Sequence, residues 1–169
     1  MNALESTSVP SIDATFALID EEVKIVDESR VRGKHTLIVF GFTHYRVVCP
    51  LALGKLTRVL DRLKPRARTV QPLNITVDPE RDTPDVLRAF LKDQYLRFIG
   101  LTGSREQIDN AKRAFRVFAP RRDEGAGDDT IPHTAITSVL DPAGRLIDHW
   151  PDALDEDTVV MRLATLITV

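Results

Sequence analysis

The chain has 169 residues, of which 43% are hydrophobic and 28% are charged. This length and balance suit one globular domain with its own core, and they exclude collagen-like, low-complexity and fully disordered chains. Lysine and arginine number 23 against 25 aspartates and glutamates, and the net charge of -2 argues against a nucleic-acid-binding domain. Because Cys49 is the only cysteine, the chain has no internal disulfide and no four-thiolate zinc site.

The sequence predicts no membrane span. Its longest apolar run covers residues 36–42, whereas a bilayer-spanning helix needs roughly 20 apolar residues. The first residues lack the basic flank and apolar stretch of a signal peptide, so the chain is expected either to be cytoplasmic or to have lost a leader or anchor. Residues 1–12 are polar and contain Pro10, which predicts a loose N-terminal arm ahead of a single domain at residues 13–169.

The first part of the chain predicts a hairpin, a strand and a helix. Residues 15–19 and 22–26 form the expected entry hairpin, and residues 37–42 are an unbroken apolar strand of the kind that is buried on both faces. Pro50 suits the first position of a helix, which Pro65 ends. Leucines spaced three and four residues apart give this helix one apolar stripe, comprising Leu53, Leu56, Leu60 and Leu63.

The second part alternates strands with helices. The expected strands cover residues 70–77, 97–101, 134–140 and 146–150. Thr83 and Pro84 mark one helix start, and Ser104 and Gln107 have the spacing of a capping box at another. The apolar face expected of that second helix comprises Ile108, Ala111, Phe115 and Phe118. The last two strands form a hairpin, and a helix at residues 155–169 closes the chain.

This order of elements predicts an α/β fold. Strands that alternate with helices in the middle of the chain favour parallel neighbours joined by crossover helices, and an antiparallel hairpin follows them. The combination is typical of a thioredoxin-like fold, with a central mixed sheet flanked by helices and an N-terminal β-hairpin. We find no internal repeat and no linker that would divide the chain.

Cys49 is the strongest candidate for a functional side chain. It follows a buried strand and a loop, and it directly precedes Pro50 and a helix. Unpaired N–H groups and the dipole at such a helix start favour the thiolate, which is the nucleophilic and metal-binding form. The alternative is a buried cysteine that acts as a small hydrophobic residue. Loops at the carboxyl ends of parallel strands are where α/β proteins place ligands, which favours the functional thiol.

Several segments resemble the signatures of the Sco/SenC family, in the family's order. Residues 41–50, GFTHYRVVCP, resemble its segment Gly-Tyr/Phe-Thr-His-Cys-Pro-x-x-Cys-Pro. Residues 76–84, TVDPERDTP, match the second signature nearly letter for letter, and residues 98–103 resemble the third. Residues 131–134, IPHT, stand where the family has Val-Asp-His-Thr/Ser. Together these segments extend over most of the chain.

The resemblance implies a thioredoxin-like fold and delivery of copper for the dinuclear copper centre of cytochrome c oxidase, or thiol redox work in service of that assembly. It also implies a periplasmic or otherwise extracytoplasmic location, and a cytochrome c oxidase subunit or another copper or thiol assembly protein as partner. Family members bind copper through two cysteines and a distant histidine. The second cysteine carries over onto Cys49 and the histidine onto His133, whereas Tyr45 stands at the first cysteine and Pro132 replaces an acid.

These departures change the expected copper site. Thiolate and imidazole both suit copper, and thiolate favours Cu(I), but two ligands make a weaker and more open site than three. Tyr45 is expected either to bind Cu(II) as phenolate or to pack over the site, since a phenol is mostly protonated near neutral pH. His44 is expected to be an additional ligand or to orient the loop by a hydrogen bond. The dithiol–disulfide cycle of the family is lost within this chain, although a disulfide with a partner stays available.

The functional hypothesis is therefore a copper-binding accessory protein with no catalytic residue, using Cys49 and His133. One alternative is a one-cysteine thiol peroxidase or reductase, since residues 48–50 also resemble the reactive segment of peroxiredoxins, although Arg46 stands where that family has Thr or Ser. Another is a redox-inactive docking module that kept the fold and lost the chemistry. The charged residues 78–82 are expected to form a loop that pairs internally through Arg81 and caps the next helix.

Overall fold

The structure is a computed structural model that describes residues 16–43, 48–119 and 135–167, except for the side chains of residues 48–50. The arm expected at residues 1–12 lies outside these ranges. The strands are β1 (Ala17–Asp20), β2 (Ile25–Asp27), β3 (His35–Gly41), β4 (Val70–Thr76), β5 (Ile99–Thr102), β6 (Ile136–Leu140) and β7 (Leu146–Pro151). The helices are α1 (Glu28–Val31), α2 (Val48–Arg62), α3 (Pro84–Leu91), α4 (Arg105–Ala114) and α5 (Glu156–Leu166), with a short 3-10 helix η1 (Arg66–Thr69).

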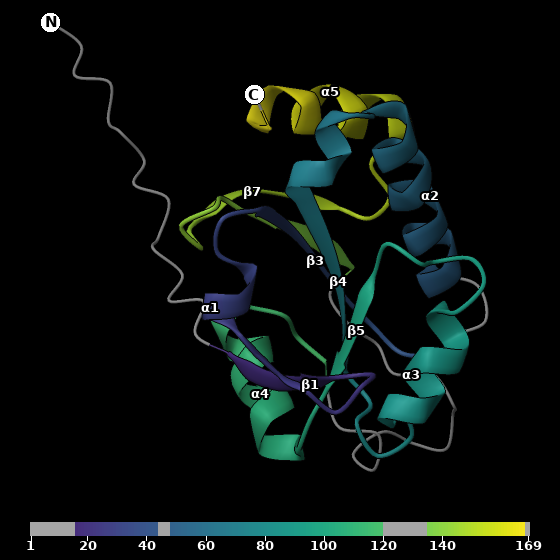
Figure 1. The fold of residues 1–169 in the computed structure, drawn as a ribbon, viewed down its shortest axis with the longest axis vertical. Helices are drawn as coiled ribbons and strands as arrows, with labels where there is room; N and C mark the ends of the chain where they lie inside the picture. Colours follow the sequence, from purple (N-terminus) through teal and green to yellow (C-terminus); the bar gives the residue numbers. More distant parts are fainter. Residues whose placement is uncertain (1–15, 44–47, 120–134, 168–169) are drawn as a thin grey trace, which may run out of the picture.

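The seven strands form one mixed sheet in the order β2-β1-β5-β4-β3-β6-β7 (Figure 1). Strands β3, β4 and β5 are parallel neighbours, as the alternation of strands and helices predicts. The β1–β2 and β6–β7 pairs are antiparallel hairpins, and both join the central strands in antiparallel fashion. The predicted thioredoxin-like architecture, with its mixed sheet, flanking helices and N-terminal hairpin, is confirmed.

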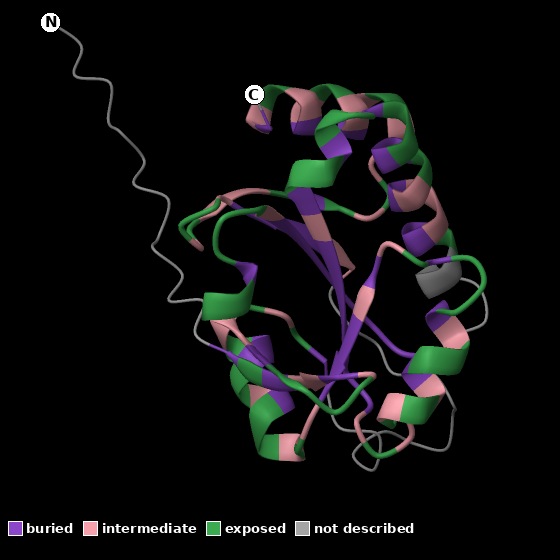
Figure 2. Cartoon of the chain, in the orientation of Figure 1, coloured by how far each residue is buried: buried purple, intermediate pink, exposed green. Residues whose placement is uncertain are grey.

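The sheet carries a hydrophobic core on each face because alternate side chains of its central strands point to opposite sides. In β3, Ile38 and Phe40 belong to the cluster under α1 and α4, whereas Leu37 and Val39 belong to the cluster under α2 and α5. Figure 2 shows the central strands largely buried, with the exposed residues concentrated on the helices and loops. The unbroken apolar run at residues 37–42 predicts a strand buried on both faces, and β3 confirms it.

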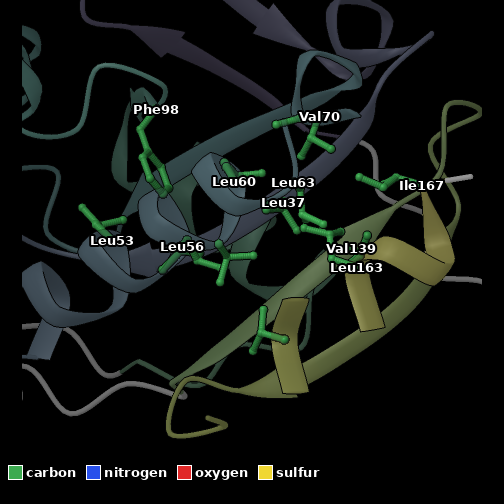
Figure 3. Packing of buried hydrophobic residues seen from close by; sticks show 14 of the residues in the cluster. Leu37, Leu53, Leu56, Leu60, Leu63, Val70, Phe98, Val139, Leu163 and Ile167 are labelled. Carbon is green, nitrogen blue, oxygen red and sulfur yellow. The ribbon is translucent and has the colours of Figure 1, made fainter. Parts of the chain in front are cut away.

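Helix α2 packs the predicted leucine stripe into the second of these cores (Figure 3). Leu53, Leu56 and Leu60 are fully buried, and Leu63 just beyond the helix is 7% exposed. They meet Val139 of β6 and Leu163 of α5 in the same cluster. The stripe thereby fixes how α2 lies on the sheet, and with it the position of the helix's first turn.

The helix starts are confirmed at α3 and α4. The Oγ1 of Thr83 accepts a hydrogen bond from the Val86 N–H, and Ser104 and Gln107 form a reciprocal capping box. The end of α4 differs from the prediction. The helix stops at Ala114, a turn earlier than the apolar spacing suggests, and Arg116 adopts a positive φ of 54°. Phe118 consequently leaves the apolar face and is 71% exposed.

Within the ranges that the structure describes, the helices are too short or too polar to cross a bilayer.

Candidate metal site at the carboxyl edge of the sheet

Strands β3 and β4 end side by side, and this edge positions the candidate site. Gly41 is the register partner of Thr76, and the Val77 N–H donates to the Gly41 carbonyl at 2.8 Å, which continues the pairing beyond both strands. Helix α2 begins at Val48, shortly after β3 leaves the sheet (Figure 1). The edge is the carboxyl end of a parallel pair, where α/β proteins bind ligands.

Cys49 lies in the first turn of α2, since the helix begins one residue before it. The sequence predicts that Cys49 directly precedes a helix opening at Pro50, whereas the helix begins two residues earlier, at Val48. Cys49 is still at the helix N-terminus, where the dipole and the unpaired N–H groups favour a thiolate. The side chain of Cys49 is not described, and His44, Tyr45 and His133 lie outside the described residues. In the part of the chain that is described, no three His, Cys, Asp or Glu side chains gather as a metal-binding group. The ligand set is a prediction from the resemblance.

The start of the segment that carries His44 and Tyr45 is held by a buried carboxylate, Asp82. Thr43 donates to Asp82 twice, from its N–H at 3.0 Å and from its Oγ1 at 2.5 Å. The Thr76 Oγ1 donates to the same carboxylate at 2.7 Å. Asp82 is fully buried, so these donors replace the water that its charge would otherwise require. The carboxylate thus ties the ends of β3 and β4 to the start of α3.

The loop at residues 78–82 is ordered by its own charges. Arg81 forms an ion pair with Asp78, which confirms the expected internal pairing, and the Asp82 N–H donates to the Asp78 carbonyl at 2.9 Å. Glu80 pairs with Arg105 at 2.5 Å and so links the loop to the first turn of α4. The loop does not itself cap α3, because Thr83 does so. Asp78 Oδ1 is buried and accepts no hydrogen bond from the described residues.

The segment that carries His133 is anchored at both of its described ends. Before it, the largely buried Lys112 donates to the Ala119 carbonyl at 2.8 Å and pairs with Asp109 at 3.0 Å. After it, Ala135 accepts a hydrogen bond from the Asp152 N–H at 2.8 Å. Because β6 runs antiparallel to β3, with Thr137 opposite Val39, the start of β6 lies at the edge where β3 ends. β6 therefore begins at the same edge of the sheet at which β3 ends and the chain continues toward Cys49.

Replacing Asp82 by asparagine is expected to lower the free energy of unfolding by about 2 kcal/mol, because an amide N–H₂ would face the donors of Thr43 and Thr76. For a chain of this size that corresponds to a fall in Tm of about 4–8 °C. Urea and thermal denaturation measure it, with Asp93→Asn as the control, since Asp93 is exposed. A variant as stable as the control would show that the buried carboxylate does not hold this edge.

The fold and this edge define a class: thioredoxin-like α/β proteins that place a cysteine in the first turn of the helix following a central parallel strand. The profile of the SCO1/SenC family matches residues 5–168, and the chain belongs to that family. The SCO2-like protein of Rickettsia prowazekii is 37% identical over 141 residues, which cover 82% of this chain and 69% of the relative. The mitochondrial SCO2 homolog of Bos taurus is 37% identical over 148 residues, 85% of this chain and 55% of the relative.

Solved structures agree with the sequence relatives. Arabidopsis thaliana ScoI with copper bound superposes with a TM-score of 0.83 at 32% identity, over 90% of this chain and 96% of that one. Yeast Sco1 with copper bound gives a TM-score of 0.85 at 33% identity, over 92% of this chain and 88% of that one. The family resemblance stated from the sequence motifs is confirmed.

Proposed function

We propose that this protein is a copper-binding accessory protein for assembly of the dinuclear copper A centre of cytochrome c oxidase, with Cys49 and His133 as its copper ligands. The Sco family is known for cytochrome c oxidase assembly, and similar solved structures carry copper. The observation that carries the proposal for this chain is the placement of Cys49 in the first turn of α2, at the edge where β6 begins.

The donor chemistry fits copper as a cargo ion. A helix-terminal thiolate and an imidazole are both copper ligands, and the thiolate favours the Cu(I) state. With Tyr45 at the position of the family's first cysteine, the site has fewer strong donors and holds copper more weakly. Tyr45 and His44 are the candidates to complete the coordination, the phenolate of Tyr45 suiting Cu(II). An open coordination shell lets a recipient ligand bind before the donor ligands leave.

The single cysteine also limits which redox reactions the protein can carry out with a partner. A chain with one cysteine runs no internal dithiol–disulfide cycle, so any redox step of Cys49 takes place with a second molecule. The proposed partner is a cytochrome c oxidase subunit or another copper or thiol assembly protein. The proposed compartment is extracytoplasmic, in keeping with the mitochondrial relatives.

Copper titration tests the proposal. The wild-type chain is expected to bind about one copper ion, and Cys49→Ala and His133→Ala are each expected to weaken binding by more than about 100-fold, which exceeds the usual effect of removing an outer-shell partner. Competition with a chelator measures Cu(I), and electron paramagnetic resonance measures Cu(II). His149→Ala is the control, because His149 is an exposed histidine on β7. Absence of binding, or binding that survives both changes, would contradict the proposal.

The thiolate-favouring position of Cys49 also supports the second candidate, a one-cysteine thiol peroxidase or reductase. Arg46 occupies the position where peroxiredoxins carry Thr or Ser, which weighs against it. One assay distinguishes the two functions. A peroxidase would consume hydrogen peroxide faster than a free thiol and would need Cys49 to do so, whereas a copper-binding protein would not. We expect no such acceleration.

A further inference from the structure

Lys55 reaches from α2 to the corner between β7 and α5. Its Nζ donates to the carbonyl oxygens of Asp152 and Leu154, the latter at 2.8 Å. The side chain is half-buried, and burial lowers the pKa of its ammonium group, although Asp152 opposes that change. A partly buried cation that donates to two backbone carbonyls satisfies those acceptors and fixes the helix against the corner.

Asp152 is in turn bound to the start of β6. Its N–H donates to the Ala135 carbonyl at 2.8 Å, and its Oδ1 accepts a hydrogen bond from the Thr137 Oγ1 at 2.9 Å. The β6–β7 register places Ile136 opposite Pro151, so these bonds continue the hairpin beyond its last pair. Ala135 lies two residues after His133 in the chain. Asp152 therefore holds the point at which the His133 segment enters the sheet.

Lys55 and Cys49 lie on the same helix, six residues apart. A helix rises about 1.5 Å per residue, so the separation along its axis is about 9 Å, without a flexible joint between them. A continuous set of bonds thus runs from the helix of Cys49 through Lys55 and Asp152 to Ala135. These bonds connect the helix that carries Cys49 with Ala135, which lies two residues after His133 in the chain.

Besides the apolar packing of α2 against α5, two ion pairs join these helices, and they differ from the bonds of Lys55. Arg58 pairs with Glu156 at 2.9 Å, and Arg62 pairs with Asp157 at 2.8 Å. Both arginines are exposed, 61% and 45% respectively, and exposed ion pairs contribute little. They also bind carboxylates on α5 and not the corner that holds β6. Of Lys55, Arg58 and Arg62, Lys55 is the one whose hydrogen bonds lead to Ala135 through Asp152.

We infer that Lys55 is a positioning residue that holds the Cys49 helix at a fixed distance from the entry of the His133 segment. The inference rests on the proposed function, because it gives Lys55 a role in forming the proposed copper site. It does not make Lys55 a ligand. The geometry can be measured without copper, which keeps the two ideas separately testable.

The copper-free test uses His133→Cys, which adds a second thiol where the proposed ligand stands. In a glutathione buffer the two thiols are oxidised to a disulfide, giving up two electrons and two protons, while glutathione disulfide is reduced to two thiols. The equilibrium gives the effective concentration of one thiol at the other. Adding Lys55→Met is expected to lower this value about tenfold, through loss of the charge-assisted bonds to the corner. Arg58→Met is the matched control and should leave it unchanged.

The copper test uses the wild-type background. Lys55→Met is expected to weaken Cu(I) binding about tenfold, and Lys55→Arg, which keeps a cationic donor, should recover most of it. If Lys55→Met does not fold, Lys55→Gln replaces it in both tests, since its shorter amide cannot keep both bonds. An unchanged effective concentration in the folded Lys55 variant, or no disulfide in the His133→Cys protein, would overturn the inference. A wild-type chain that binds no copper but shows the expected disulfide equilibria would overturn the proposed function alone.

Discussion

Tyr45→Cys is expected to tighten Cu(I) binding by more than about 100-fold, because it adds a soft thiolate to a site whose remaining proposed donors are one thiolate and one imidazole. The change also gives the chain a second thiol at the spacing of the family's paired cysteines. In a glutathione buffer the two thiols are then expected to form a reversible disulfide. Two electrons and two protons pass to glutathione disulfide, which leaves as two reduced molecules.

Chelator competition and thiol counting by mass spectrometry measure the two effects. The matched control is Leu51→Cys, which adds a thiol on the exposed side of the first turns of α2, where Leu51 is 66% exposed, without the family spacing. If Tyr45→Cys binds Cu(I) no more tightly than this control, Tyr45 does not stand at a ligand position. The carry-over of the copper site from the family would then be wrong for this chain.

Leu60→Ala is expected to lower the free energy of unfolding by about 3 kcal/mol. Leu60 is fully buried, and its removal leaves a cavity in the apolar cluster that also contains Leu56 and Val139 (Figure 3). Close-packed surroundings relax only in part, so the loss includes the missing contacts as well as the transfer of the side chain. The corresponding fall in Tm is about 6–12 °C.

Urea denaturation of the metal-free protein measures this change, because bound copper would add its own stabilisation. The control is Leu51→Ala on the same helix, where the side chain is largely exposed and the expected change is within about 0.5 kcal/mol. Equal losses in the two variants would mean that the leucine stripe does not anchor α2. The helix could then not serve as the rigid carrier of Cys49.

The loop at residues 78–82 shows where sequence patterns stop being informative. The pattern Asp-Thr-Pro marks a helix start, and Thr83 does cap α3. An acidic residue beside a cap ordinarily faces solvent, yet Asp82 points inward to Thr43, 39 residues earlier in the chain. Only the parallel pairing of β3 with β4 brings these residues together, so no local pattern could reveal the contact. The two threonines near the ends of β3 and β4 can be recognised as partners of Asp82 only once the structure is known.

Phe118 and Lys55 show the same limit of sequence patterns. Phe118 is expected to be buried but is exposed, whereas Lys55 is expected to be exposed but is half-buried. Phe118 continues the helical spacing of Ile108 and Phe115, but the backbone turns at Arg116 and leaves it exposed. Lys55 looks like a solvated side chain beside the leucine stripe. Its partners are backbone carbonyls almost one hundred residues away in the sequence, as the separations of 97 and 99 positions show. Periodicity carries no information about such contacts.

The sequence by itself determined the α/β class, the two hairpins, the leucine stripe of α2 and the family, because these depend on hydrophobic spacing, caps and motifs that are local in the chain. It also determined that any thiol chemistry within this chain depends on Cys49 alone. The tertiary structure alone decided which distant segments meet at the carboxyl edge: Asp82 with Thr43, and Lys55 with the corner that holds Ala135. The physical reason is that a buried charge or carbonyl takes whichever partner the packed sheet and helices bring within reach.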